Sequence, residues 1–162
     1  MTDIRGRGYI MRRIVTIGMG IIMLLNIMAQ AQQPPVDASD TFVSEAGETC
    51  PLFAVEFQLS GKTATIALGG GRSIVIFPAF AVTMTNLETG TQITLSATGS
   101  FHQTTLANGQ LEIVYTGRNL ILDPEAGFVL AIGTFRAVYE GNIAVIPLSG
   151  KGTLTDVCEL LA

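Results

Sequence analysis

The sequence predicts an all-β domain, an antiparallel meander of about eight to ten strands that closes into a barrel, with a β-sandwich as the alternative. Three observations support this fold class. Apolar and polar residues alternate with a period of two, as in residues 63–68 and 92–98. Turns rich in Gly, Asn and Asp separate the alternating stretches. No stretch between the two cysteines has the apolar stripe of a helix.

The chain begins with a pattern typical of a secretory signal peptide. Arg12-Arg13 precedes an apolar run, Ile14 to Met28, which Ala29-Gln30-Ala31 follows as a small-residue cleavage site. The run is shorter than the roughly 20 residues that span a bilayer. We therefore expect residues 1–31 to form a signal helix that is removed after Ala31, with an uncleaved N-terminal helix as the alternative. The protein would then be secreted or extracytoplasmic, without a stable membrane anchor after cleavage.

The next segment, residues 32–49, contains a Pro pair, four acidic residues and few large apolar ones, and it is expected to be a flexible spacer. Cys50 and Cys158 are the only cysteines, and they stand near the two ends of the expected β domain, residues 50–162. In an exported protein two thiols are expected to oxidise, so we predict a disulfide that closes nearly the whole domain. Two unpaired thiols are the alternative.

The strands themselves are bounded by the turn signals. A terminal disulfide favours closure into a barrel, and the missing Trp and the long Cys spacing disfavour an immunoglobulin sandwich. The expected strands lie near residues 52–60, 63–68, 72–77, 79–86, 91–98, 100–106, 110–122 and 128–139, with one or two more within 143–158.

Charge and motif content exclude several function classes. The chain has nine basic and thirteen acidic side chains, and four of the arginines precede residue 14, so the expected domain is acidic. An acidic surface without a Lys/Arg cluster repels phosphate, so we expect no nucleic-acid partner. The turn at Gly69 to Arg72 lacks the pattern of a phosphate-binding loop, and no G-x-S-x-G nucleophile motif occurs. One His and dispersed carboxylates do not form a metal site, so we expect neither metal nor cofactor.

Hairpin registers predict which side chains share a face. If Asn108-Gly109 is a two-residue turn, His102 lies opposite Tyr115, and if Asp123 pairs with Gly127, Tyr115 lies opposite Phe135. His102, Tyr115 and Phe135 would then form one inward row. Gln103, Thr105, Glu112 and Arg136 would lie on the solvated face. Asp123 and Glu125, at a hairpin tip, are expected to form the turn and face solvent.

This aromatic row is the candidate ligand site. An interior with one imidazole and one phenol could bind a small apolar ligand. It could also serve a cyclase or isomerase in which His102 moves a proton and Tyr115 orients it, although neither is a confident catalytic residue. The alternative is a His that is only a hydrogen-bonded core residue.

The hairpin between residues 110 and 139 carries a second signal. Its apolar residues fall at even positions near the tip and at odd positions near the base. A regular strand cannot bury both sets on one face, so we expect a bulge or a marked coil midway. Gly117 and Gly133 lie at the crossover and, in the register given above, face each other.

Several short motifs of the expected β domain occur together. They are Cys50-Pro51, Gly71-Arg72, Thr85-Asn86-Leu87, Phe101-His102, Thr116-Gly117-Arg118-Asn119-Leu120, Asp123-Pro124-Glu125-Ala126-Gly127 and Asp156-Val157-Cys158. On these motifs the chain resembles a group of short exported bacterial proteins, common among actinobacteria, with two terminal cysteines and an all-β domain. The resemblance implies export and a single β domain, and it carries no reaction, ligand or partner.

The expected function is therefore a non-enzymatic exported β-barrel domain that binds a small apolar ligand or an extracellular protein surface. The alternatives are the cyclase or isomerase and a purely structural surface module. Cavity volume separates them, since an open interior of at least ~300 Å³ would favour a bound small molecule.

Overall fold

The computed structural model describes residues 34–162, which form a β-sheet domain. The signal peptide predicted for residues 1–31 lies outside the described residues. Within residues 34–162, no helix has the length and apolar character needed to cross a membrane. The elements are β1 (Val36–Asp37), β2 (Asp40–Ser44), β3 (Val55–Ser60), β4 (Lys62–Gly69), β5 (Arg72–Ile76), β6 (Ala81–Asn86), β7 (Gln92–Ser96), β8 (Ser100–Thr105), β9 (Leu111–Asp123), β10 (Gly127–Glu140), β11 (Ile143–Asp156) and α1 (Val157–Leu161).

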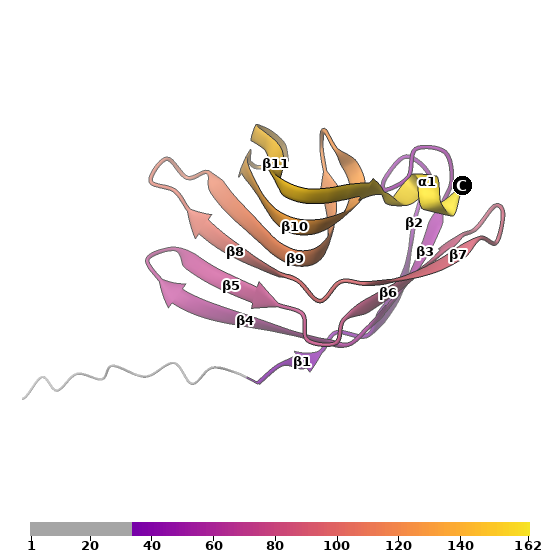
Figure 1. Ribbon diagram of the computed structural model, residues 1–162, viewed down its shortest axis with the longest axis horizontal. Helices are drawn as coiled ribbons and strands as arrows, with labels where there is room; N and C mark the ends of the chain where they lie inside the picture. Colours follow the sequence, from indigo (N-terminus) through magenta and orange to yellow (C-terminus); the bar gives the residue numbers. More distant parts are fainter. Residues whose placement is uncertain (1–33) are drawn as a thin grey trace, which may run out of the picture. The chain divides into compact units, whose positions relative to one another are not determined.

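The strands form two antiparallel sheets (Figure 1). The seven-stranded sheet has the order β1-β4-β5-β8-β9-β10-β11, and the four-stranded sheet has the order β2-β3-β6-β7. Four times, at β1–β2, β3–β4, β5–β6 and β7–β8, the chain leaves one sheet and enters the other after a short bend. The bend between β3 and β4 requires Gly61, because a Cβ there would lie 2.5 Å from the carbonyl oxygen of Ala79. The all-β class and the antiparallel pairing are confirmed.

The strands predicted between residues 52 and 139 correspond in order to β3 through β10. The prediction of a flexible spacer for residues 32–49 is wrong where this segment forms β1 and β2, which pair with β4 and β3. Val36 pairs with Thr63, and the Phe42 ring stacks on the Phe57 ring with centroids 5.0 Å apart. The segment 143–158 contains one strand and the start of α1, a helix whose five residues are too few for a periodic apolar stripe.

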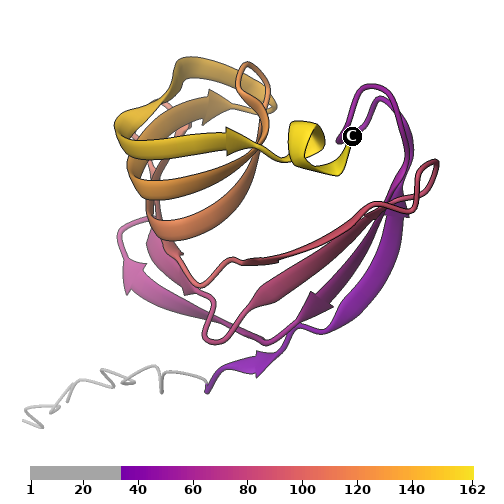
Figure 2. The ribbon, with the colours of Figure 1, turned by 45° about the vertical axis from the view of Figure 1, so that its right-hand side comes forward.

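The main core lies between the four-stranded sheet, α1 and the tip of the β9–β10 hairpin. The ring of Phe57 in β3 meets the ring of Phe128 in β10 edge-on, with centroids 5.8 Å apart. Figure 2 shows α1 between the curled strands and the strands of the four-stranded sheet. The buried residues of this core are Cys50, Phe53, Val55, Phe57, Val82, Met84, Phe128, Leu130, Val157 and Leu161.

β9, β10 and β11 curl strongly (Figures 1 and 2), and a row of glycines crosses these three strands of the seven-stranded sheet. Gly117 pairs with Gly133, which pairs in turn with Gly152, and all three have positive φ, +87°, +142° and +146°. A Cβ on Gly133 or Gly152 would lie 2.2 or 2.1 Å from a carbonyl oxygen of the adjacent strand. At the end of the row, Gly99 lies 3.2 Å from where a Gly117 Cβ would be. The missing side chains permit both the backbone angles and the close approach of the strands.

The predicted pairing of Gly117 with Gly133 is confirmed, and the hairpin coils there without a bulge. The β9–β10 register is continuous from Asp123 opposite Gly127 to Leu111 opposite Tyr139. Near the tip, β10 is buried on both faces, so apolar residues at even and at odd positions are both accommodated, although Leu122 of β9 is exposed. Even-numbered residues such as Leu130 face the main core, whereas Val129, Ile121 and Ala131 pack with Phe135 in a second cluster.

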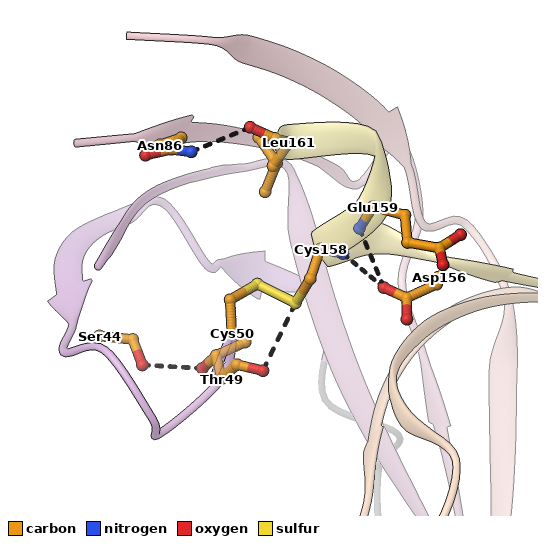
Figure 3. Close-up of a disulfide and its surroundings, with 8 residues drawn as sticks. All are labelled: Ser44, Thr49, Cys50, Asn86, Asp156, Cys158, Glu159 and Leu161. Atoms are coloured by element: carbon orange, nitrogen blue, oxygen red, sulfur yellow. Dashed lines mark hydrogen bonds between the residues drawn. A yellow bond between two sulfur atoms is a disulfide. The ribbon is translucent and has the colours of Figure 1, made fainter. Parts of the chain in front are cut away.

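The disulfide fastens the C-terminal end of the chain to the β2–β3 loop (Figure 3). Cys50 and Cys158 are bonded with their Cα atoms 5.5 Å apart, so the predicted bridge is confirmed. The Asp156 side chain caps α1 by accepting hydrogen bonds from the amides of Cys158 and Glu159, at 2.7 and 3.1 Å. At the other end of α1, the buried Asn86 donates to the Leu161 carbonyl oxygen at 3.0 Å.

We expect Gly133→Ala to destabilise the domain more than Gly141→Ala. Both glycines have positive φ, but nothing lies within 4 Å of a Cβ on Gly141, whereas a Cβ on Gly133 would meet the Lys151 carbonyl oxygen at 2.2 Å. Because such overpacking forces the backbone to shift, the free energy of unfolding should fall by about 1–3 kcal/mol more for Gly133→Ala. Thermal melting of the oxidised proteins measures the difference, and equal losses would contradict the close approach of β10 and β11.

Replacing both cysteines with Ser should lower the free energy of unfolding by as much as about 4–5 kcal/mol, the chain-entropy value for a loop of this length. The bond joins residues 108 positions apart and therefore restricts nearly the whole unfolded domain. Denaturant unfolding of the double variant, compared with the oxidised and the reduced native sequence, measures the loss. The reduced protein should match the variant, and an unchanged midpoint would exclude a stabilising role.

Candidate functional site

The curl of the β9–β10 hairpin brings its tip back to its base. Asp123 closes β9, and Tyr139 lies opposite Leu111 near the other end of the hairpin. Asp123 lies twelve positions after Leu111, which would be about 40 Å in a flat strand. The Tyr139 hydroxyl nevertheless donates a hydrogen bond to Asp123 Oδ2 at 2.9 Å. This contact across the hairpin forms the centre of the candidate site.

Asp123 is only 2% exposed, so the prediction that it faces solvent is wrong. Its Oδ1 accepts hydrogen bonds from the amides of Glu125 and Ala126, at 3.0 and 2.8 Å, and this part of the turn prediction is correct. Its Oδ2 accepts from Tyr139. Within residues 34–162, the side-chain ion pair joins Arg136 to Glu112, and no basic side chain pairs with Asp123. The carboxyl group is therefore buried among neutral donors.

The two tyrosines next to Asp123 are held in their neutral forms. Burial raises the pKa of Tyr115, partly offset by its interaction with Tyr139. Burial, followed by the neighbouring Tyr115 and Asp123, raises the pKa of Tyr139 far above its ordinary value. Both phenols consequently keep their protons at neutral pH, and Tyr139 donates its proton to Asp123.

A cavity of about 710 Å³, partly open to solvent, lies against this cluster. We call it the tyrosine cavity. Its volume falls within the range of ligand sites, roughly 300–1,000 Å³. Its wall combines apolar side chains of the hairpin with a few polar groups. The lining residues are Glu48, Thr49, Leu111, Ile113, Tyr115, Leu122, Asp123, Pro124, Gly127, Tyr139, Gly141 and Asn142.

The predicted placement of His102 is wrong. Phe101, not His102, lies opposite Tyr115, and His102 lies opposite Val114 with its side chain exposed. The turn is one residue longer than expected, because Leu106 and Gln110 close a three-residue loop that ends on Gly109 with φ +85°. Such a loop shifts the register by one residue and turns every side chain of β8 to the other face.

Tyr115 and Phe135 are paired as predicted, but they have different surroundings. Phe135 is 5% exposed and belongs to the second cluster, so it does not line the tyrosine cavity. Tyr115 lines that cavity and also a smaller one of about 110 Å³ that Phe101 and Asn119 border. The row in the structure is therefore Phe101, Tyr115 and Phe135, with Phe101 in the place predicted for His102.

The face predicted to be solvated is only partly so. Arg136 is exposed and donates to the Glu112 carboxylate, whose side chain is 24% exposed. Gln103 is half-buried and accepts a hydrogen bond from Ser73 at 3.2 Å. The same register shift places Gln103 on the face of Tyr115, which explains its partial burial.

The chemistry of the tyrosine cavity suits binding. With His102 exposed and on the opposite face from Tyr115, the proton relay considered from the sequence is not assembled. Within residues 34–162, no three side chains of His, Cys, Asp or Glu gather as metal ligands. The cavity instead offers two phenols, one buried carboxyl group and an apolar wall, a set that can orient a small molecule.

Asp123 and Tyr139 were not recognised as partners from the sequence. Their contact depends on the curl of the hairpin, and no local pattern encodes a distance between the ends of a strand pair. The sequence did contain a signal for which residue of β8 points inward. Phe101 is more apolar than its neighbour His102, and buried faces favour apolar residues, so Phe101 was the better candidate for the buried face.

Comparison with known proteins found no family model, no curated protein and no solved structure that matches the chain. The candidate site is therefore interpreted from its own geometry and chemistry.

The free energy of unfolding should fall as the pH rises above about 10, the ordinary pKa of tyrosine. Both described tyrosines have raised pKa values when folded, so the unfolded chain loses their protons first and is favoured at high pH. Their contribution is fully present below pH ~10 and is lost above it. Denaturant unfolding across this range should give a negative slope that Tyr139→Phe reduces. A slope unchanged in the variant would show that Tyr139 is not the group responsible.

Proposed function

We propose that this chain is an exported, non-enzymatic β domain that holds a small, largely apolar ligand in the tyrosine cavity. One observation carries the proposal, the cavity of about 710 Å³ beside a buried polar cluster. Leu111, Ile113 and Leu122 supply apolar wall, while the phenols and Asp123 supply fixed points for hydrogen bonds. A mostly apolar cavity with a few convergent polar groups is typical of small-molecule sites.

Export is part of the same proposal. The leader pattern of residues 1–31 supports it, and a disulfide that closes the domain is compatible with an oxidising compartment outside the cytoplasm. We also propose that the two sheets and α1 act as a barrel-like shell, open on the side of the tyrosine cavity. The resemblance to short exported two-cysteine proteins is consistent with this picture.

A second candidate function, association with an extracellular protein, is favoured by the last strand. β11 is an edge of the seven-stranded sheet and has unpaired backbone groups along one side. Ile143, Val145 and Ile146 are 68%, 42% and 40% exposed, which is high for side chains of this kind. Native mass spectrometry of the purified protein separates the candidates, since it reports a retained small molecule or a protein complex in one spectrum.

A bulky substitution in the wall of the tyrosine cavity tests whether the cavity binds a ligand. We expect Ile113→Trp to abolish saturable binding of the neutral fluorescent probe N-phenylnaphthylamine, because the indole would occupy space that the probe needs. Val145→Trp is the matched control, since Val145 lies on exposed β11 and outside the cavity wall. The control should bind the probe like the native protein.

Equal binding by the two Trp variants would contradict the proposal, provided both melt cooperatively. Absence of binding to the native protein, with only a protein complex in the native mass spectrum, would favour the second candidate function. If neither is found, a purely structural module remains.

A further inference from the structure

We propose that the ligand of the tyrosine cavity is an amphipathic amine, an alkyl- or arylalkylammonium ion whose cationic group contacts Asp123 and whose apolar part lies against the hairpin. This inference rests on the proposed function and specifies the chemistry of that ligand. It follows from the hydrogen bonding of Asp123, from the charges around the cavity and from the side chains of its wall.

Asp123 is the first observation. A buried charge is normally paired or coordinates a metal, because burying it alone is strongly unfavourable. Asp123 is 2% exposed, and the three groups of the described residues that donate to it, the amides of Glu125 and Ala126 and the Tyr139 hydroxyl, are all neutral. A carboxylate offers about four acceptor positions, so one remains for a donor. Because the cavity wall includes Asp123, the amine would reach this position from the cavity.

The charges around the cavity are the second observation. Among residues 34–162, its wall contains two acidic residues, Asp123 and Glu48, and no Lys, Arg or His. Glu48 is exposed and accepts hydrogen bonds from the Glu45 amide and the Ser44 hydroxyl, at 3.0 and 3.3 Å. Within the described part of the chain, no basic side chain forms an ion pair with it. The resulting negative potential attracts a cation and repels a carboxylate. An amine is therefore favoured over a fatty acid of the same length.

The remaining wall suits the rest of such a ligand. Tyr115 and Tyr139 border the cavity next to Asp123, and aromatic rings attract ammonium groups through their negative faces. Leu111, Ile113 and Leu122 provide apolar contact for a hydrocarbon chain or ring. The wall thus has a polar part at Asp123 and an apolar part along the hairpin. An amphipathic amine matches it, with its cationic group at Asp123 and its apolar group along the hairpin.

The test compares three probes of equal chain length, octylammonium, octanol and octanoate, by isothermal titration calorimetry on the purified oxidised protein. Octylammonium should bind tightest, and octanol should bind about tenfold or more weakly, the usual effect of losing a charged hydrogen bond. Octanoate should bind weakest. This ranking needs no variant, so it holds even if a substitution at Asp123 impairs folding.

Asp123→Asn tests the residue itself. It should weaken octylammonium about tenfold or more and change octanol little, because it removes the charge and keeps an acceptor for the two amides. Glu125→Gln is the matched control, since it removes the same charge from an exposed side chain of the same turn that does not line the cavity. The control should keep the native ranking. Melting curves show whether each variant is folded.

The outcomes separate this inference from the proposed function. If octanol or octanoate binds as tightly as octylammonium, the amine inference is wrong and the small-ligand function stands. If no probe binds and N-phenylnaphthylamine does not bind either, both are wrong. If Asp123→Asn and Glu125→Gln weaken octylammonium equally, the amine is attracted by overall charge and not by Asp123.

Discussion

The curl of the β9–β10 hairpin is the constraint on which the rest of the domain depends. Sheets twist by their nature, but these strands curl far enough to bring two ends that a flat ribbon would hold about 40 Å apart into hydrogen-bond contact. The glycine row at Gly117, Gly133 and Gly152 permits this, because Cβ atoms there would meet the backbone of neighbouring strands. Without the curl, Asp123 and Tyr139 would not meet, and the tyrosine cavity would lose its enclosing wall.

The curled hairpin also explains how a small domain buries both sides of one ribbon. Near the tip, one face packs against the four-stranded sheet and α1, and the other encloses the second cluster. The end of the chain completes the main core, because Val157 and Leu161 of α1 are fully buried. The cap from Asp156, the contact with Asn86 and the disulfide hold α1 in this position. A helix of five residues would not be stable without such contacts.

Much of the fold could be predicted because period-two alternation and turn chemistry are local. The strands from β3 to β10 and the pairing of Gly117 with Gly133 follow from these signals. The site could be predicted only in part. Tyr115 was identified, whereas His102 was assigned to the wrong face because one additional loop residue inverts a whole strand. The strands β1 and β2 lack a strong pattern of their own and are stabilised by pairing with β4 and β3.

The sequence by itself determined the class of the fold, the positions of most turns and the partner of each cysteine, since all three depend on residue types and on their spacing. Only the tertiary structure decided which side chains that are distant along the chain come into contact. The residues around Asp123 identify it as part of a turn. Its burial and its hydrogen bond with Tyr139 depend on the curl of the hairpin, which brings Tyr139 next to it. The physical reason is that the curvature of a strand pair accumulates from small rotations between successive residues. The distance between the two ends of the hairpin therefore depends on the packed sheet and not on any local stretch of residues.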